Sequence, residues 1–362
     1  MPIHFAASRW EAARENARRW WAGELKRPLI HVILTNDDPG RPPARLPYKR
    51  FTAHYGLETP MENIVDACDY RLSRERYLGD AFPTLPSNFG PGIVAAFLGA
   101  RVVCDDRTVW FHPAQELEPV AMNFAYDPDN AWFRRIGEFY RAALDRFEDR
   151  VLIKMTDLGG TLDILSTFRK NVNLLTDLLV NGEEIKRLTW RLHDLWWRYY
   201  EEFNAILQPR NRGYTSWAPF YSETPYYMLQ CDFLYMLGPD HFDEFVKPEL
   251  AASCRRLGNA FYHLDGPGQL PSLDSLLTIP DLKGVQWVPG PPGRSCSRWP
   301  EVYRKIREAG KLAQVLGGPE EFDAVVEQLG SAEGLVFVWN APIARRTEAL
   351  EFLARHGVPA GP

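Results

Sequence analysis

The chain has few cysteines, and they follow no pairing pattern. Its 362 residues include five cysteines and no Cys-x-x-Cys pair, which argues against a disulfide framework and is typical of a reducing compartment. No stretch approaches the roughly 18 apolar residues of a membrane span, and the first residues lack the pattern of a secretion signal. The formal net charge of -5 offers no basic surplus for nucleic acid. We therefore expect a cytoplasmic protein that binds neither membranes nor nucleic acids.

Aromatic residues, by contrast, are abundant. The chain contains 12 Trp, 15 Tyr and 20 Phe. Many of these belong in a core, but three tryptophans follow apolar runs that are expected to be strands. Flat apolar side chains at strand ends are typical of the walls of a ligand pocket. We therefore expect Trp217, Trp287 and Trp339 to line a substrate pocket.

Strand and helix patterns alternate from about residue 83 onward, which indicates parallel βαβ units. Seven or eight such units over this length favour a (β/α)8 TIM-type barrel at 83–362, with a hairpin inserted at 100–118. Residues 1–82 are expected to be an N-terminal helical and extended segment packed on the barrel, with a helix from Ser8 to about Gly23 and a strand at 29–35. The predicted barrel strands are 84–89, 151–157, 214–220, 260–265, 284–288, 312–316 and 335–340, and the predicted helices are 130–149, 172–207, 240–257, 298–309, 319–330 and 343–356.

Polar side chains gather where these predicted strands end. His263 and Asp265 are two residues apart, so an extended strand places them on the same side. An imidazole and a carboxylate so placed can bind a metal, relay a proton or hold a polar substrate. Since ligand sites of parallel α/β proteins lie at the carboxyl ends of strands, other strand-end residues are candidates to contact substrate: Asn88, Asp157, Gln286, Gln314 and Asn340.

Each of the chemically interesting residues also has a structural interpretation. Asp157 could cap the helix that follows it, and His263 could be a hydrogen-bonded core histidine. Cys231 could be a small buried hydrophobe rather than a metal ligand. The sequence leaves these alternatives open.

The pieces together resemble the uroporphyrinogen decarboxylase superfamily, which includes corrinoid-linked methyltransferases. The resemblance covers roughly residues 83–356 and rests on the order and spacing of several motifs. These are Thr156-Asp-Leu-Gly-Gly-Thr-Leu-Asp163, Cys231-Asp-Phe with Gly238-Pro-Asp-His-Phe-Asp-Glu-Phe-Val246, Tyr262-His-Leu-Asp265, Gly317-Gly-Pro-Glu-Glu-Phe322 and Trp339-Asn-Ala-Pro-Ile-Ala-Arg345. The resemblance implies a (β/α)8 barrel.

The resemblance also implies a zinc site, with departures. Thiol methyltransferases of the family bind zinc through a His-x-Cys pair and a later cysteine. Here His263 matches the histidine, Asp265 stands where the first cysteine would be, and Trp339-Asn340 offers no cysteine at the last strand. We expect zinc at His263 and Asp265, with Cys231 as a third ligand; such a site is harder than one with two thiolates.

The function that the resemblance implies is methyl transfer to or from a small molecule. His263, Asp265 and Asp157 would be catalytic, and the cobalamin would arrive on a partner corrinoid protein, because the chain has no Asp-x-His-x-x-Gly module. The alternative is a decarboxylase, or a non-catalytic protein that binds a tetrapyrrole or small acid. The family's arginine-rich substrate motif has no clear counterpart here, which favours the methyltransferase. Substrate and oligomeric state stay open.

Overall fold

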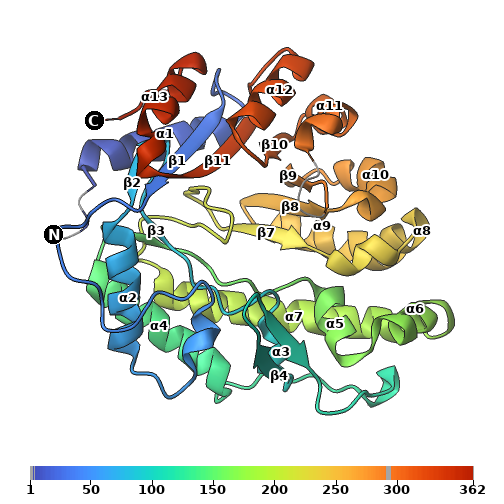
Figure 1. Cartoon of the computed structure of the whole chain (residues 1–362). Coiled ribbons are helices and arrows are strands. Elements are labelled where there is room, and N and C mark those ends of the chain that lie inside the picture. The colour runs from blue at the N-terminus through green and yellow to red at the C-terminus, as the bar shows by residue number, and fades with distance from the viewer. Residues whose placement is uncertain (1–2, 4, 291–294, 362) are drawn as a thin grey trace.

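A central, mostly parallel sheet with helices around it forms the mixed α/β structure of this chain (Figure 1). The computed structural model describes residues 3, 5–290 and 295–361. Within them the main sheet has seven strands, all parallel to their neighbours except β2, which is antiparallel to β1. Their spatial order is β2 (Arg76–Gly79), β1 (Leu29–Thr35), β11 (Leu335–Pro342), β10 (Leu312–Val315), β9 (Leu282–Val288), β8 (Asn259–Asp265) and β7 (Tyr226–Gln230).

Strand β1 lies inside this sheet, between β2 and β11. Its residues pair in parallel with β11 from Leu29 with Val336 to Thr35 with Pro342. The strand was predicted at the correct residues but as part of a segment outside the barrel. The structure therefore joins this part of 1–82 to the C-terminal strands.

The later strands β8 to β11 were predicted within two residues of their bounds, whereas the prediction around β7 was wrong. Residues 214–220 were expected to form a strand, but the segment turns back on itself through an isolated antiparallel bridge between Tyr214 and Ser222. The strand in this region is β7, whose sequence Tyr-Tyr-Met-Leu-Gln was not recognised. It pairs in parallel with β8.

Two smaller sheets complete the strands of the described residues. Strand β3 (Thr84–Leu85) pairs in parallel with β6 (Leu152–Ile153), and both are shorter than predicted. Strands β4 (Arg101–Cys104) and β5 (Val109–His112) form the antiparallel hairpin expected at 100–118.

The helices lie on both sides of the strands in Figure 1. The predicted helix at 172–207 is divided in two, since it breaks at Asn181, immediately before Gly182. The helices are α1 (Ala7–Trp21), α2 (Met61–Ser73), α3 (Val94–Phe97), α4 (Ala131–Phe147), α5 (Thr161–Phe168), α6 (Asn171–Val180), α7 (Gly182–Leu207), α8 (Pro239–His241), α9 (Lys247–Arg256), α10 (Leu273–Leu277), α11 (Pro300–Glu308), α12 (Pro319–Leu329) and α13 (Arg346–Arg355), with a π-helical turn, η4 (Phe242–Val246), between α8 and α9.

Helix α1 packs against the sheet through its tryptophans. Trp20 is buried, stacks on Phe261 of β8 with ring centroids 6.0 Å apart, and donates its indole hydrogen to the carbonyl oxygen of Leu335, 3.2 Å away. Phe261, Leu312 and Val336 belong to the same buried cluster. They lie at or near the amino ends of β8, β10 and β11, so apolar packing occupies these ends and the carboxyl ends are left for polar groups.

Candidate functional site

One histidine and two aspartates meet where β7 and β8 end. Single ligand atoms of Asp232, His263 and Asp265 all lie within 4.8 Å of one another. His263 and Asp265 are half-buried, while Asp232 is exposed. Three such donors at this spacing can hold a divalent cation and leave a position open towards solvent.

The alternation of strand β8 places this cluster. Phe261, His263 and Asp265 share one face of the strand, and Tyr262 and Leu264 lie on the other face, fully buried in the main core. The predicted pairing of His263 with Asp265 on one side is what the structure shows. The polar pair begins where the apolar packing around Phe261 ends.

A row of glutamines continues from His263 across the sheet. The register aligns Gln230 of β7 with His263, His263 with Gln286 of β9, and Gln286 with Gln314 of β10. The Nδ1 atom of His263 hydrogen-bonds to Oε1 of Gln286, and Nε2 of Gln286 donates to Oε1 of Gln314 at 2.6 Å. With Nδ1 engaged as the donor, Nε2 of His263 is left as the atom that can bind a metal or a proton. Gln286 and Gln314 therefore orient the imidazole from behind.

Asp232 is positioned by the helix that packs beside it. It begins the short helix η3 (Asp232–Met236), and its backbone amide donates to Oδ2 of Asp163 at 3.0 Å. The amide of Phe233 donates to Oδ1 of the same carboxylate at 2.8 Å. Asp163, in the first turn of α5, thus fixes the start of η3. Asp163 ends the motif that begins at Thr156, but nothing in the sequence indicates its contact with the amides of η3.

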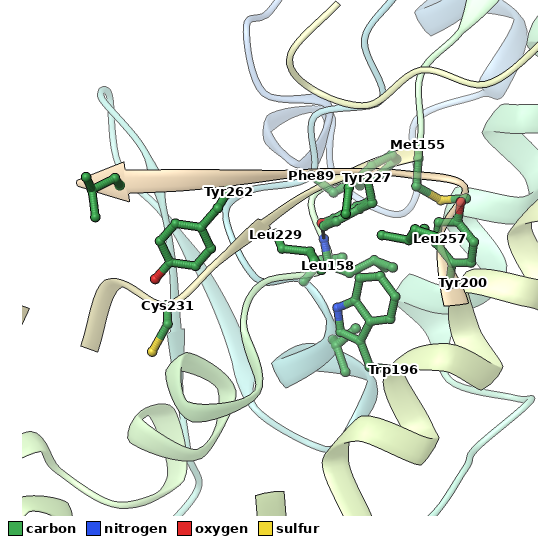
Figure 2. Packing of buried hydrophobic residues seen from close by; sticks show 14 of the residues in the cluster. Phe89, Met155, Leu158, Trp196, Tyr200, Tyr227, Leu229, Cys231, Leu257 and Tyr262 are labelled. Carbon is green, nitrogen blue, oxygen red and sulfur yellow. Dashed lines mark hydrogen bonds between the residues drawn. The ribbon is translucent and has the colours of Figure 1, made fainter. Parts of the chain in front are cut away.

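Cys231 does not join the ligand cluster. It is buried with Tyr262 in the main core (Figure 2), and desolvation raises the pKa of its thiol well above the usual value. Its carbonyl oxygen accepts a hydrogen bond from Nε2 of the buried Gln269 at 3.0 Å. Within the described part of the chain, Asp232 takes the place that Cys231 was expected to fill, because the next residue along the chain projects towards His263.

Asp157 lies in the loop that follows β6, and close packing holds this loop. The indole nitrogen of Trp196 donates to the carbonyl oxygen of Gly159 at 2.9 Å, and the amide of Leu158 donates to the hydroxyl of Tyr227 at 2.7 Å. Figure 2 shows Trp196, Tyr227 and Leu158 within one buried cluster. A side chain on Gly160 would come within 2.2 Å of the carbonyl oxygen of Gln230, so this loop requires glycine there.

The acidic groups of the site raise one another's affinity for protons. Desolvation raises the pKa of Asp157 to about 6, against the opposing effects of the Gly159 amide and His263. Desolvation, and then the carboxylates of Asp265 and Asp157, raise the pKa of Asp232, although part of its side chain is exposed. Such an arrangement favours a cation, because a positive charge would remove the repulsion.

Two cavities adjoin this cluster. The first, of about 380 Å³, lies between η3, α5 and the β4–β5 hairpin, and Gln230, Asp163 and Asp232 are in its wall. The second, of about 370 Å³, has both apolar and polar residues in its wall and contains the expected Asn88, Asp157 and Trp217. The ring of Trp217 stands edge-on to that of His263, with centroids 5.2 Å apart. Asp157 and Trp217 thus connect the second cavity to the ligand cluster.

The second cavity also contains Lys154, which the sequence analysis did not select. Lys154 comes directly after the apolar strand β6, and a charged residue at the end of such a strand was the signal available in the sequence. The wall of this cavity thus includes three charged side chains, Arg50, Lys154 and Asp157.

Two of the three tryptophans that were predicted to line the pocket point away from the candidate site. Trp287 is fully buried on the opposite face of β9 from Gln286 and packs against Trp299, with centroids 5.3 Å apart. Trp339 packs against Phe352 of α13 at 5.9 Å. Successive strand residues point to opposite faces, so both tryptophans belong to the layer between strands and helices. Asn340 is exposed near the end of β11, without a side-chain hydrogen bond to the described residues.

The comparisons with known proteins identify a fold relative. No known family profile matches the sequence, and no curated protein does. Among solved structures, a methyltransferase from Methanosarcina mazei has a TM-score of 0.56 and 11% sequence identity, over 86% of this chain and 96% of that one. At this identity the likeness establishes a shared α/β fold and nothing about activity.

The described helices were also compared with the thickness of a bilayer. None combines the length and the apolar composition that crossing a membrane requires.

Proposed function

We propose that this protein is a metal-dependent methyltransferase whose strands close into a (β/α)8 barrel that includes β1. A divalent metal ion, with zinc as the first choice, would be held by Asp232, His263 and Asp265. The observation that carries the proposal is that three ligand atoms from these residues lie within 4.8 Å of one another. The fold shared with a methyltransferase supports the reaction class.

The residues present suit such an ion. Zinc in catalytic sites commonly has three protein ligands drawn from histidine and carboxylates, with a fourth position for water or substrate. Nε2 of His263 is available because Nδ1 is hydrogen-bonded to Gln286, and metal-binding histidines usually make such a hydrogen bond through their other ring nitrogen. The exposed side of Asp232 leaves access for a ligand.

The metal would act as a Lewis acid and lower the pKa of a bound thiol, hydroxyl or water of the acceptor. The chain's own contribution is to orient the acceptor and to receive its proton. Asp157, with a pKa of about 6, is mostly ionised at neutral pH and can take the proton when the methyl group leaves its donor for the acceptor atom. The methyl donor would be a methylated corrinoid on a partner protein.

Metal analysis separates this assignment from the one based on sequence. Protein prepared without a polyhistidine tag is expected to contain about one equivalent of zinc. The Asp232→Asn and His263→Ala variants should lose it, whereas Cys231→Ser, whose side chain lies in the core, should retain it. Retention in Asp232→Asn together with loss in Cys231→Ser would contradict the proposed ligand set.

Activity is tested with methylcobalamin as the donor and a panel of thiols, amines and hydroxylated compounds as acceptors. Methyl transfer that falls with the metal in Asp232→Asn supports the proposal. Decarboxylation of uroporphyrinogen with no methyl transfer to any acceptor would instead establish the decarboxylase.

A further inference from the structure

The second cavity contains a half-buried amine with almost no partner. The Nζ atom of Lys154 has one contact, the carbonyl oxygen of Trp217 at 3.5 Å, and no carboxylate oxygen of the described residues lies within 4 Å of it. The buried Lys311 instead donates to the carbonyl oxygens of Ile279 and Pro280 at 2.9 and 3.1 Å. Lys311 is satisfied by the fold, and Lys154 is not.

The charged group with the largest effect on Lys154 is a cation. Desolvation, followed by the nearby guanidinium of Arg71, lowers the pKa of Lys154 to about 7, against a weaker opposite effect of Glu75. Arg50 is also part of the cavity wall. An anion placed here would remove both the desolvation cost and the repulsion between cations.

Other hydrogen-bond donors of the same cavity are also unused. The indole nitrogen of Trp217 is buried and has no acceptor among the described residues. The Oδ1 atom of Asn88 accepts from the amide of Gly90 at 3.3 Å, which leaves its NH2 group without a partner in the described structure. Lys154, Trp217 and Asn88 all line the cavity of about 370 Å³. The cavity therefore offers several donors and a positive charge to a ligand that supplies oxygen acceptors.

We propose that this cavity binds the carboxylate group of a small monoanionic substrate, with Lys154, Trp217 and Asn88 as donors. The carboxylate of Asp157 lies in the wall of the same cavity, so a second negative charge on the bound group would be repelled. This orients the ligand with its acid group at Lys154 and the rest of the molecule towards His263. The proposal rests on the proposed function only in assigning this carboxylate to the substrate of the metal site.

Nuclear magnetic resonance of the lysine ε-carbons tests the proposal without knowledge of the substrate. The chain has nine lysines, and Lys154 is assigned by its absence in Lys154→Met, or in Lys154→Arg if that variant does not fold. Propionate is added to the labelled wild-type protein at constant ionic strength. We expect the pKa of Lys154 to rise saturably by at least about one unit, while the ε-carbon resonance of the exposed Lys283 does not respond to propionate.

Two other anions and one variant test whether a carboxylate group bound at Lys154 causes the shift in its pKa. Phosphate and methanesulfonate should each shift the pKa of Lys154 less than propionate does, and an equal or larger shift with either would overturn the assignment to a carboxylate. An unchanged Lys154 pKa in saturating propionate would overturn it as well. In Asp232→Asn the propionate shift should persist; if it is lost, the anion binds at the aspartate cluster instead. A persistent shift in a protein that binds no metal and transfers no methyl group would refute the proposed function alone.

Discussion

The imidazole of His263 is hydrogen-bonded through Nδ1 to the side-chain oxygen of Gln286 on the neighbouring strand. Gln286 is in turn held by its hydrogen bond to Gln314. The orientation of the imidazole ring therefore depends on two glutamines that are both buried. This contact gives the first of four predictions.

Gln286→Leu should weaken zinc binding about 10- to 100-fold, because the ring of His263 loses the acceptor that sets its tautomer and orientation. The dissociation constant is measured by competition with a chelator of known affinity. Gln286→Glu retains an acceptor in the same place and should bind the metal more tightly than Gln286→Leu. Equal affinity in the two variants would show that the contact does not serve the metal site.

Replacing Asp157 with asparagine should stabilise the protein at neutral pH but not in acid. The folded-state pKa of Asp157, about 6, lies above its reference value of 3.8, so ionisation costs folding free energy. This cost is absent below about pH 4 and fully developed above pH 6. We expect Asp157→Asn to raise the free energy of unfolding at pH 7.5 by on the order of 2 kcal/mol and to have little effect at pH 4.

The measurement is urea unfolding at the two pH values. Asp106→Asn serves as the control, since Asp106 is exposed and its replacement should change stability equally little at both. A stabilisation that is the same at pH 4 and pH 7.5 would contradict a raised pKa for Asp157.

Gly160→Ala should destabilise the protein by about 1–3 kcal/mol, because a Cβ there meets the carbonyl oxygen of Gln230 on β7. Gly238 is a matched control: it also precedes a helix with a negative φ, and a Cβ there meets no atom within 4 Å. The urea midpoint should therefore fall for Gly160→Ala and stay near that of the wild type for Gly238→Ala. Equal midpoints would mean that the loop after β6 can move away from β7.

Tyr227→Phe should cost about 1–3 kcal/mol, since it leaves the buried amide of Leu158 without its acceptor. Hydrogen exchange provides a local readout of the same change. The amide hydrogen of Leu158 should exchange faster in the variant. The exchange rates of amides in the distant helix α13 should change only as much as the change in global stability requires. Unchanged protection of Leu158 would show that another acceptor replaces the hydroxyl.

Patterns with short range were readable from the sequence. Strand β1 and the spacing of His263 and Asp265 depend on local alternation, and both were predicted. Strand β7 was missed because residues 214–220 have a similar composition, and only their antiparallel bridge to Ser222 excludes them from the sheet. Which of two apolar segments pairs with β8 is decided by tertiary contacts.

The direction in which side chains point at the ends of strands was harder to predict. Trp287 and Trp339 follow the same alternation as their polar neighbours but one residue out of phase, so both face the helices. The sequence could not decide between Cys231 and Asp232 as a ligand. The start of η3 is set by hydrogen bonds from the amides of Asp232 and Phe233 to Asp163, which lies 69 and 70 residues earlier in the chain. Lys154 was overlooked because an isolated lysine in an apolar strand reveals nothing about the arginine and indole beside it.

The glutamine row behind His263 also determines where protons can travel. A side-chain amide neither takes up nor releases a proton near neutral pH. Gln286 and Gln314 therefore cannot relay a proton to or from the Nδ1 side of the imidazole. Exchange of protons with the ring is then confined to Nε2. Any acid–base step at His263 must therefore run through the same entrance as the ligand, and a bound ligand would shut the ring off from bulk water.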